Sequence, residues 1–187
     1  NTVYDCSNLN IDSIDTNTFN GLNNVRLIDL GKNQIEVLKS GTFSNLDSLE
    51  EIKLNENRIS LIEENSFQNL KNLRILHLFL NSLASLNGNE FQLSNNFDSI
   101  TRLDLSYNQL TKLKANQFNG LFNLYELNLY SNRLNSLEAN ALFGMSNLGI
   151  LSMGQNNLTS LRKEFFTGIS KLELLNLDKN QIESIES

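Results

Sequence analysis

The feature that most constrains this chain is an internal repeat with a period of 24 residues. Seven segments begin with an aliphatic residue, and the spacings between these first residues are 24, 24, 27, 24, 24 and 24. Each segment follows the pattern L-x-x-L-x-L-x-x-N-x-L, in which L is any aliphatic residue. The segments begin at Val25, Leu49, Leu73, Ile100, Leu124, Leu148 and Leu172. A repeat of this length predicts a solenoid, because one coil cannot bury its own apolar side and must stack on its neighbours.

The pattern predicts a short strand in each repeat. Aliphatic residues at the fourth and sixth positions point to the same side of a strand, and successive strands add in parallel at about 4.8 Å. The second half of each repeat must then supply the return path that a parallel pair requires. Residue numbers within a repeat are given below as positions counted from its first aliphatic residue.

An asparagine recurs at position nine, and we call these seven residues the ladder asparagines. The chain contains 32 asparagines. A buried amide offers one acceptor and two donors, so it can bond backbone groups of its own and adjacent coils. The ladder asparagines are Asn33, Asn57, Asn81, Asn108, Asn132, Asn156 and Asn180.

The return path carries a second apolar signature. An aromatic residue recurs at position nineteen in most repeats and predicts a spine beneath the convex surface. The members are Phe19, Phe43, Phe67, Phe91, Phe118, Leu142 and Phe166. The repeat that begins at Leu73 is three residues longer than the others, within residues 92–99, which predicts a bulge on the convex side.

The 24-residue unit with its F-x-x-L return resembles the "typical" class of extracellular leucine-rich repeats, the class found in Toll-like receptors, Slit-like guidance proteins, small proteoglycans and variable lymphocyte receptors. The segments Thr42–Leu46 and Gln117–Leu121 carry this resemblance most clearly. It implies an α/β repeat fold, a right-handed horseshoe solenoid with a parallel β-sheet on its concave face. Short helical turns or irregular segments would return along the convex side.

The two ends of the chain depart from the repeat. Residues 1–24 resemble a cap-like first repeat, in which Cys6 matches the last cysteine of the family's Cys-rich N-terminal cap. That cysteine is normally disulfide-bonded to one upstream, and no second cysteine is present in this chain. Cys6 occupies the place of Leu30 and Leu54, so we expect it to be buried. Residues 25–187 hold the repeats, and no C-terminal capping motif follows Ile185.

The sequence disfavours catalysis and cofactor binding. The single histidine, His77, and the single cysteine, Cys6, fall three strands apart, roughly 14 Å, and on different faces of the sheet. A Cys–His nucleophile pair is therefore excluded, and no Gly-rich phosphate loop is present. Asp5 and Asp29 share a row and could hold a cation, but Lys53 comes next in that row, so a solvated acidic edge is favoured over a metal site.

One glycosylation sequon is present, at Asn157-Leu158-Thr159. Asn157 follows a ladder asparagine and is expected to point outward. We therefore predict that it can carry a glycan if the protein is secreted from a eukaryotic cell. Together with the repeat class and the cap-like Cys6, this favours an extracellular location. No run of apolar residues is long enough to span a membrane.

Positions three, five, seven and eight are predicted to face the concave side. Over residues 1–24 and the seven repeats, the residues at these four positions include seven acids and four bases. That negative balance argues against a nucleic-acid partner. Large apolar residues gather only in the middle repeats, which is where binding hot spots are expected. The predicted binding residues are Ile75, His77, Phe79, Leu80, Arg102, Asp104, Tyr107, Glu126, Asn128 and Tyr130.

The sequence thus predicts a non-catalytic, protein-binding ectodomain of the receptor or recognition type. Two alternatives stay open. One is an adhesion or structural matrix module, for which self-association would be expected. The other is a bacterial or intracellular leucine-rich repeat interaction protein, in which Cys6 would be reduced.

Overall fold

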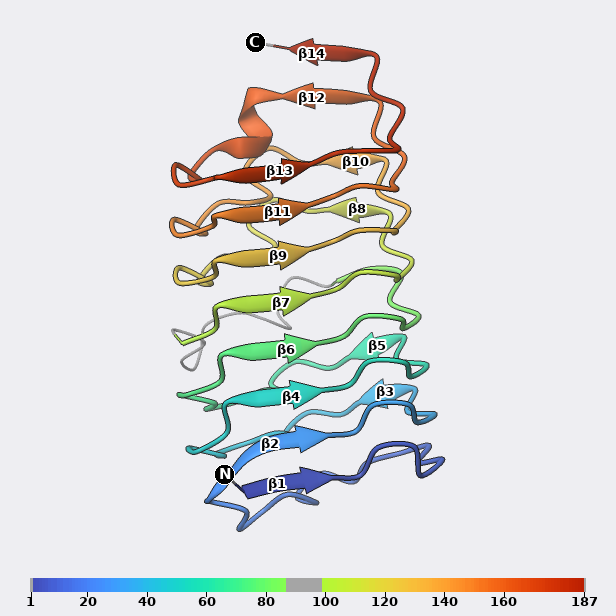
Figure 1. Ribbon diagram of the computed structural model, residues 1–187, viewed down its shortest axis with the longest axis vertical. Coiled ribbons are helices and arrows are strands. Elements are labelled where there is room, and N and C mark those ends of the chain that lie inside the picture. Colours follow the sequence, from blue (N-terminus) through green and yellow to red (C-terminus); the bar gives the residue numbers. More distant parts are fainter. Residues whose placement is uncertain (1, 87–98, 187) are drawn as a thin grey trace.

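The computed structural model describes residues 2–86 and 99–186, which form a stack of parallel strands along the long axis of the molecule (Figure 1). Eight strands build one sheet in the order β1-β2-β4-β6-β7-β9-β11-β13. Every neighbouring pair in this sheet is parallel, so the predicted leucine-rich repeat solenoid with a parallel sheet is confirmed. The strands are β1 (Thr2–Asp5), β2 (Val25–Asp29), β4 (Glu51–Lys53), β6 (Ile75–His77), β7 (Arg102–Asp104), β9 (Glu126–Asn128), β11 (Ile150–Ser152) and β13 (Leu174–Asn176).

The register of the sheet aligns equivalent residues of successive repeats. Ile28 pairs with Ile52, and Leu103 pairs with Leu127. These position-four side chains lie on the core side of each strand and are fully buried from β2 to β11. Each buried aliphatic side chain contributes roughly 1.5–3 kcal/mol to stability, so the apolar seam between coils is the main stabilising element.

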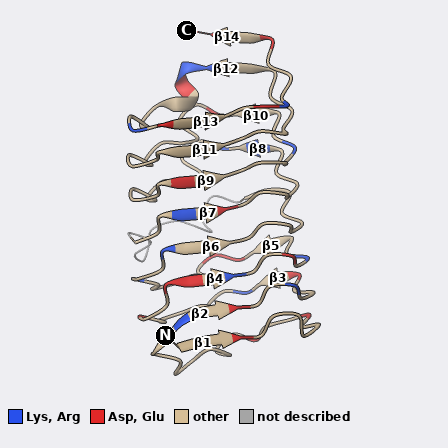
Figure 2. Cartoon of the chain, viewed as in Figure 1, with Lys and Arg blue, Asp and Glu red and all other residues tan. Residues whose placement is uncertain are grey.

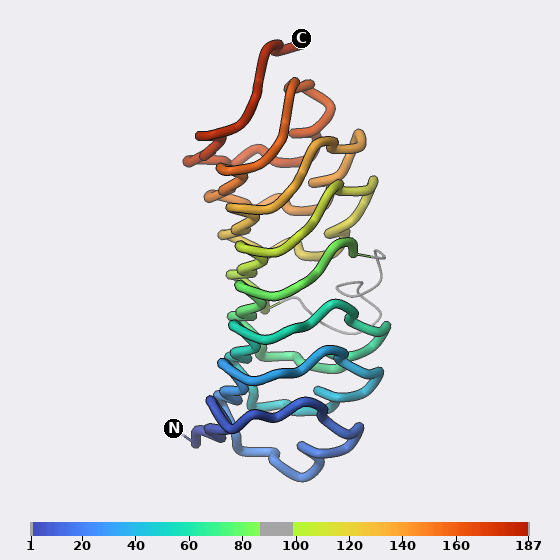
Figure 3. Tube along the Cα trace, turned by 90° about the vertical axis from the view of Figure 1, so that its right-hand side faces the viewer, coloured from blue at the N-terminus to red at the C-terminus, as the bar shows by residue number. Residues whose placement is uncertain are grey.

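The described return segments lie behind the sheet, as the side view in Figure 3 shows. They contain three two-stranded parallel pairs, namely β3 (Val37–Leu38) with β5 (Leu61–Ile62), β8 (Lys112–Leu113) with β10 (Ser136–Leu137), and β12 (Ser160–Arg162) with β14 (Ser184–Glu186). One short 3-10 helix, η1 (Lys163–Phe166), is the single helical element within the described residues. The return side is thus built from extended segments and turns, and the α contribution to the predicted α/β repeat is small.

The aromatic spine is present on the return side of the core. The rings of Phe19 and Phe43 stack with centroids 5.1 Å apart, and those of Phe43 and Phe67 with centroids 5.6 Å apart. The spine prediction is wrong at one place: Phe165 is the buried residue, whereas Phe166 is only partly buried. The tight 3-10 turn of η1 brings the preceding residue inward. Phe91 and the extra residues 92–98 lie outside the described residues.

The ladder asparagines join consecutive coils through hydrogen bonds. The amide group of Asn108 donates to the carbonyls of Leu78, Leu105 and Ser106, at 2.9, 3.1 and 3.2 Å. Its Oδ1 accepts a bond from the N–H of Leu83 in the preceding coil at 3.0 Å. One buried side chain therefore bonds backbone groups in two coils, where no regular strand ladder reaches.

Cys6 is less buried than we predicted from the sequence. Its thiol is free and packs against the core, but the residue is only partly buried. The reason is its place directly after β1, which among residues 2–86 and 99–186 pairs with a strand on one side only, namely β2. No helix among the described residues has the length and apolar character needed to cross a membrane.

Candidate functional site

We call the side of the eight-stranded sheet that faces away from the core the sheet face. It carries the residues at positions three and five of each repeat. Positions seven and eight follow in the turn after the strand. The residue at position eight has a positive φ, between 51° and 57°, in all eight coils. This left-handed backbone turns the position-eight side chain outward, and Leu80 and Tyr107 there are 45% and 48% exposed. Residues with charges of both signs are spread along the strands (Figure 2).

Position five has a structural role that limits its freedom to bind a partner. The Oδ1 of Asp29 accepts the N–H of Gly31 at 2.9 Å, and the Oδ1 of Asp104 accepts the N–H of Ser106 at the same distance. Asn128 accepts the N–H of Tyr130 at 3.1 Å. These are Asx turns, which satisfy backbone groups where the strand ends. Asp104 and Asn128, predicted as binding residues, thus also hold the turn that carries position seven.

The middle of the sheet face carries an aromatic cluster, which we define as Phe79, Leu80, Tyr107 and Tyr130. The rings of Tyr107 and Tyr130 lie 5.8 Å apart, tilted by 59°. The rings of Phe79 and His77 are nearly perpendicular, with centroids 6.1 Å apart. The structure thus brings together the apolar residues predicted from sequence on the adjacent strands β6, β7 and β9 and the turns that follow them. Ile75 lies in the same region and is partly exposed.

Tyr130 is positioned by a glycine in the next coil. A Cβ atom on Gly154 would lie 3.0 Å from Cδ2 of Tyr130 and would overlap Oδ1 of Asp178. Two neighbouring side chains therefore cover Gly154 from either side. The ring of Tyr130 therefore packs against the bare backbone of Gly154.

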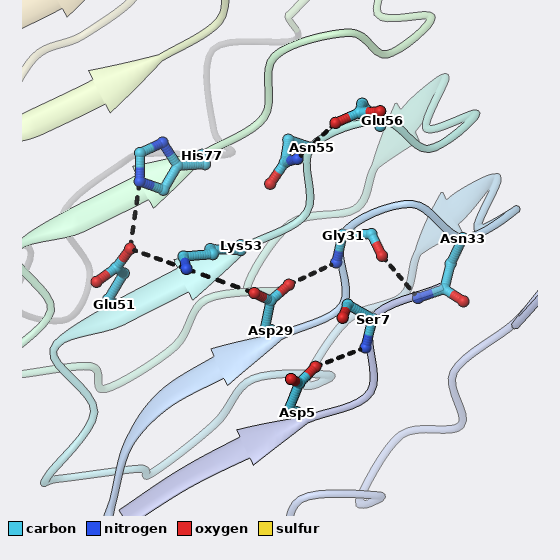
Figure 4. Close-up of polar contacts among 10 residues, drawn as sticks. All are labelled: Asp5, Ser7, Asp29, Gly31, Asn33, Glu51, Lys53, Asn55, Glu56 and His77. Carbon is cyan, nitrogen blue, oxygen red and sulfur yellow. Dashed lines mark hydrogen bonds and ion pairs between the residues drawn. The ribbon is translucent and has the colours of Figure 1, made fainter. Parts of the chain in front are cut away.

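A chain of ion pairs and polar contacts crosses the first strands of the sheet face (Figure 4). Nζ of Lys53 lies 3.4 Å from Asp29 and 4.0 Å from Glu51, and Nε2 of His77 lies 3.3 Å from the same Glu51 carboxylate. Nδ1 of His77 is buried and has no hydrogen-bond partner among the described residues. On β7 and β9, Arg102 pairs with Glu126 at 2.7 Å.

The two carboxylates considered for a cation are engaged in other contacts. Asp29 bonds Gly31 and Lys53, as described, and Asp5 accepts the N–H of Ser7 at 3.0 Å. The hydrogen bonds from Ser7 hold the pKa of Asp5 below its ordinary value. In the described ranges 2–86 and 99–186, no three His, Cys, Asp or Glu residues form a metal-binding cluster.

The sheet face also contains a hollow of about 440 Å³ at its N-terminal end. Gly31 is part of its lining, and Asp29, Asn55, His77 and Phe79 line it from three adjacent strands and the turns after them. Phe79 therefore belongs both to the aromatic cluster and to the wall of the hollow. The repeat positions of these residues predicted that they share one face, but did not indicate a hollow.

Comparison with known proteins settles the family. The sequence model of the leucine-rich repeat family matches residues 5–59, 27–83, 98–158 and 146–187. This chain belongs to the leucine-rich repeat family.

Two solved leucine-rich repeat structures are similar to this chain. One is a chain of the Toll–Spatzle complex from Drosophila, a molecular hub in development and innate immunity, with 30% identity, a TM-score of 0.87, and coverage of 95% of this chain and 23% of that chain. The other is the TLR13–ssRNA13 complex, with 27% identity, a TM-score of 0.67, and coverage of 92% of this chain and 27% of that chain. This leucine-rich repeat chain therefore spans about a quarter of either structure's length. No curated protein sequence matches it.

Besides the hollow, a second feature of this leucine-rich repeat chain was not predicted from the sequence. Along the edge where the strands begin, a groove of about 580 Å³ is lined by Arg74, Asn123, Tyr125 and Lys171, among others. Tyr125 reaches across Gly149, which has no side chain to block it, and donates a hydrogen bond to Glu173 at 3.0 Å. This bond raises the pKa of Tyr125. The contact joins residues 48 apart in sequence, so a 24-residue period gives no direct signal for it.

Asn157, the residue of the sequon, is exposed, whereas Leu158 is buried. Its backbone N–H bonds the carbonyl of Leu134 in the preceding coil at 2.8 Å. The backbone is thus held while the side chain remains accessible to solvent.

Proposed function

We propose that this chain is a non-catalytic, protein-binding part of a receptor-type ectodomain, and that the aromatic cluster on the sheet face is the centre of its binding site. The observation that carries the proposal is the exposure of Leu80 and Tyr107 beside Phe79 and Tyr130 on three adjacent coils. Apolar clusters of this kind mark interaction sites on soluble proteins. Aromatic residues dominate binding hot spots because they bury a large area with few rotamers to fix.

Charged residues surround the aromatic cluster and supply a polar rim. Arg102 and Glu126 form a pair across β7 and β9, and Glu51 on β4 is bonded to His77. Such rims exclude water from the centre of an interface and select partners by charge. The similar Toll structure was solved as a complex with Spatzle, which supports a protein ligand for this chain.

Nucleic acid is the competing ligand class, because the similar TLR13 structure was solved with ssRNA. The leucine-rich repeat fold alone therefore does not exclude RNA. The acidic balance of the sheet face, and the net charge of −6, support a protein ligand instead. Fluorescence polarisation with a labelled single-stranded RNA at physiological salt tests this: we expect no saturable binding, and micromolar affinity would contradict the preference for a protein ligand.

The absence of catalysis is part of the proposal. Cys6 packs against the core, whereas His77 bonds Glu51 on the sheet face, so the two groups lie on opposite sides of the sheet. The proposed location is extracellular, and the exposed Asn157 supports glycosylation there. Expression in a secreting eukaryotic cell should yield a mass shift that disappears in Asn157→Gln.

The decisive experiment compares two exposed aromatic residues. Once a partner is in hand, Tyr107→Ala should weaken binding by about 2 kcal/mol, because a hot-spot side chain loses its buried area. Phe122→Ala is the matched control, because Phe122 is 45% exposed and lies outside the sheet strands. Each variant is first checked for an unchanged melting temperature. Wild-type affinity in Tyr107→Ala, together with lost affinity in Phe122→Ala, would place the binding site elsewhere.

A matrix module that associates with itself is a different outcome that can be measured directly. Sedimentation velocity at micromolar concentration should show a monomer for a receptor fragment. A dimer that is lost in Tyr107→Ala would identify a second copy of this chain as the partner of the aromatic cluster.

A further inference from the structure

Two return turns of the chain contain the same four residues, Phe-Asn-Gly-Leu, at the same positions of the repeat. They are residues 19–22 and residues 118–121. We propose that the side-chain amide of Asn20, in the first of these turns, is a site of spontaneous deamidation, and that the equivalent amide of Asn119 is protected by the next coil. This modification site goes beyond the proposed binding function and does not depend on it.

The reaction needs only the Asn-Gly pair and water. The backbone nitrogen of Gly21 loses its proton to solvent and attacks Cγ of Asn20. A bond between these two atoms forms, the bond from Cγ to Nδ2 breaks, and Nδ2 takes up a proton and leaves as ammonia. Water then opens the resulting succinimide ring at either carbonyl, which yields aspartate or isoaspartate. Glycine favours the attack because it has no side chain and its backbone is conformationally free.

The sequence restricts this chemistry to few places. Of the 32 asparagines, three precede a glycine, namely Asn20, Asn87 and Asn119. Asn87 and Gly88 lie outside the described residues. The two remaining pairs share their flanking residues, so their different surroundings can be compared directly.

The two turns are also closed by the same hydrogen bonds. In each, the asparagine N–H donates to the carbonyl three residues earlier, and the leucine N–H donates to the phenylalanine carbonyl. The distances are 3.0 and 3.2 Å in residues 17–22, and 3.0 and 3.1 Å in residues 116–121. Both glycines have a positive φ, 86° at Gly21 and 102° at Gly120. A difference in reactivity must therefore come from the coils around each turn.

The next coil covers the second turn. Gly120 is buried, and Gly144 lies against it: a Cβ atom on Gly144 would be 3.0 Å from Oδ1 of Asn119 and 3.3 Å from the Gly120 nitrogen. The attacking nitrogen and the amide that it must reach are thus both packed against a neighbouring backbone. The reaction at Asn119 requires a local opening of the solenoid, which costs free energy.

The first turn is open to solvent. Asn20 and Gly21 are both exposed, and a Cβ atom on Gly21 would meet nothing within 4 Å. Nδ2 of Asn20 donates to Oδ1 of Asn17 at 3.0 Å, but this bond is exposed and involves the nitrogen that leaves, not the two atoms that join. Water can replace such a bond at little cost. The glycine nitrogen can therefore rotate onto Cγ without disturbing a neighbouring coil.

Deamidation at Asn20 changes the start of the aromatic spine. It adds one negative charge to the turn, and isoaspartate also lengthens the backbone between Phe19 and Leu22 by one atom. Phe19 is buried and stacks on Phe43, with centroids 5.1 Å apart. The longer turn should loosen this stacked ring, so the modified protein should melt at a lower temperature than the fresh protein.

The test follows both turns in one sample. The protein is incubated in mildly alkaline buffer below its melting temperature, and trypsin then releases residues 1–26 and 115–133 as separate peptides. Tandem mass spectrometry measures the deamidated fraction at Asn20 and at Asn119 over time. We expect Asn20 to react about tenfold faster, which corresponds to ~1.4 kcal/mol of activation free energy. In urea the two rates should become equal, because the local sequences are the same.

A variant at the attacking residue is the control. Gly21→Ala should slow the reaction at Asn20, because the added methyl group hinders the attack, and should leave the rate at Asn119 unchanged. Its melting temperature is checked first, since φ is positive at Gly21. Equal rates at the two asparagines in the folded protein, or a difference that persists in urea, would overturn the proposal. The urea comparison needs no variant, so it decides the matter even if Gly21→Ala does not fold.

Discussion

Gly31 and Gly154 occupy the same position of the repeat at opposite ends of the sheet face, and their surroundings are opposite. Above Gly31 lies an open hollow of about 440 Å³. Above Gly154 lie the ring of Tyr130 and the carboxylate of Asp178, which leave no room for a Cβ atom. The backbone is similar at both, since a ladder asparagine bonds each glycine carbonyl, Asn33 at 3.3 Å and Asn156 at 3.1 Å.

The difference shows that the surface of a coil is decided by the two coils beside it. Gly31 is flanked at position seven by Ser7 and Asn55, whereas Gly154 is flanked by Tyr130 and Asp178. The same residue therefore opens a hollow in one place and supports an aromatic side chain in another. Two further glycines of the sixth repeat, Gly149 and Gly168, lie beneath aromatic residues of the fifth, Tyr125 and Phe143.

The largest expected effect comes from the ladder asparagines that support both glycines. Oδ1 of Asn156 accepts the N–H of Leu134 at 2.8 Å, and this donor is left buried and unpaired in Asn156→Ala. We expect a loss of about 2 kcal/mol in the free energy of unfolding, measured by urea denaturation. Asn135→Ala, at an exposed asparagine of the neighbouring coil, is the control and should cost under about 0.5 kcal/mol.

The corresponding substitution at Asn33, beside the hollow, tests whether the two ends of the sheet face are supported in the same way. Asn33 accepts the N–H groups of Leu9 and Ile11, which belong to the outermost and more exposed coil. Asn33→Ala should therefore cost less than Asn156→Ala, because solvent can replace the lost bonds. A larger loss at Asn33 than at Asn156 would mean that the two ends are not supported in the same way.

A smaller effect is expected when a methyl group is added to each glycine. In Gly154→Ala the Cβ atom must displace Asp178 and Tyr130, so we expect a loss of about 1 kcal/mol, the low end for overpacking because side-chain ends can move. In Gly31→Ala the nearest atoms lie at 3.1 to 3.3 Å, and the change should stay within about 0.5 kcal/mol. Calorimetric melting of both variants measures this, and equal losses would remove the distinction between the covered and the open glycine.

The smallest effect concerns the tyrosine that covers Gly149. The hydrogen bond and negative charge of Glu173 raise the pKa of Tyr125, because both favour the protonated phenol. This stabilisation is present below the ordinary tyrosine pKa and disappears as the pH rises through the raised value. In Glu173→Ala the Tyr125 ring should titrate at lower pH, as followed by its NMR signals, with Tyr125→Phe used for assignment. An unchanged titration would show that Tyr125 does not span Gly149 in solution.

The periodic part of the fold could be predicted from the sequence because the same requirement recurs in every coil. Aliphatic residues at positions four and six must face the core, and the asparagine at position nine must bond its neighbours, so a single period specifies the strands and the ladder. The prediction fails in the first described coil, as at Cys6, and where a local turn changes the path, as at Phe166.

The candidate site was predictable only in part. The positions of Phe79, Tyr107 and Tyr130 within the repeat predicted that they lie on one face, because the position of a residue in the repeat determines its face. The hollow and the covered glycines depend on pairs of side chains in different coils, for which the period carries no information. A local signal for the role of position five was present, since an Asp or Asn two residues before a turn residue, as in Asp29-x-Gly31 and Asp104-x-Ser106, is typical of an Asx turn.

The direction of the asparagine bonds has a mechanical consequence. Each ladder Oδ1 accepts an N–H from the coil before it, as Asn108 does for Leu83 and Asn132 for Leu110, so each coil depends on its C-terminal neighbour for one acceptor. A force applied at the C-terminal end removes these acceptors in sequence, and each released coil of 24 residues lengthens the chain by roughly 80 Å. The solenoid under tension therefore peels one coil at a time. Its resistance is set by a single interface between two coils, however many coils the chain contains.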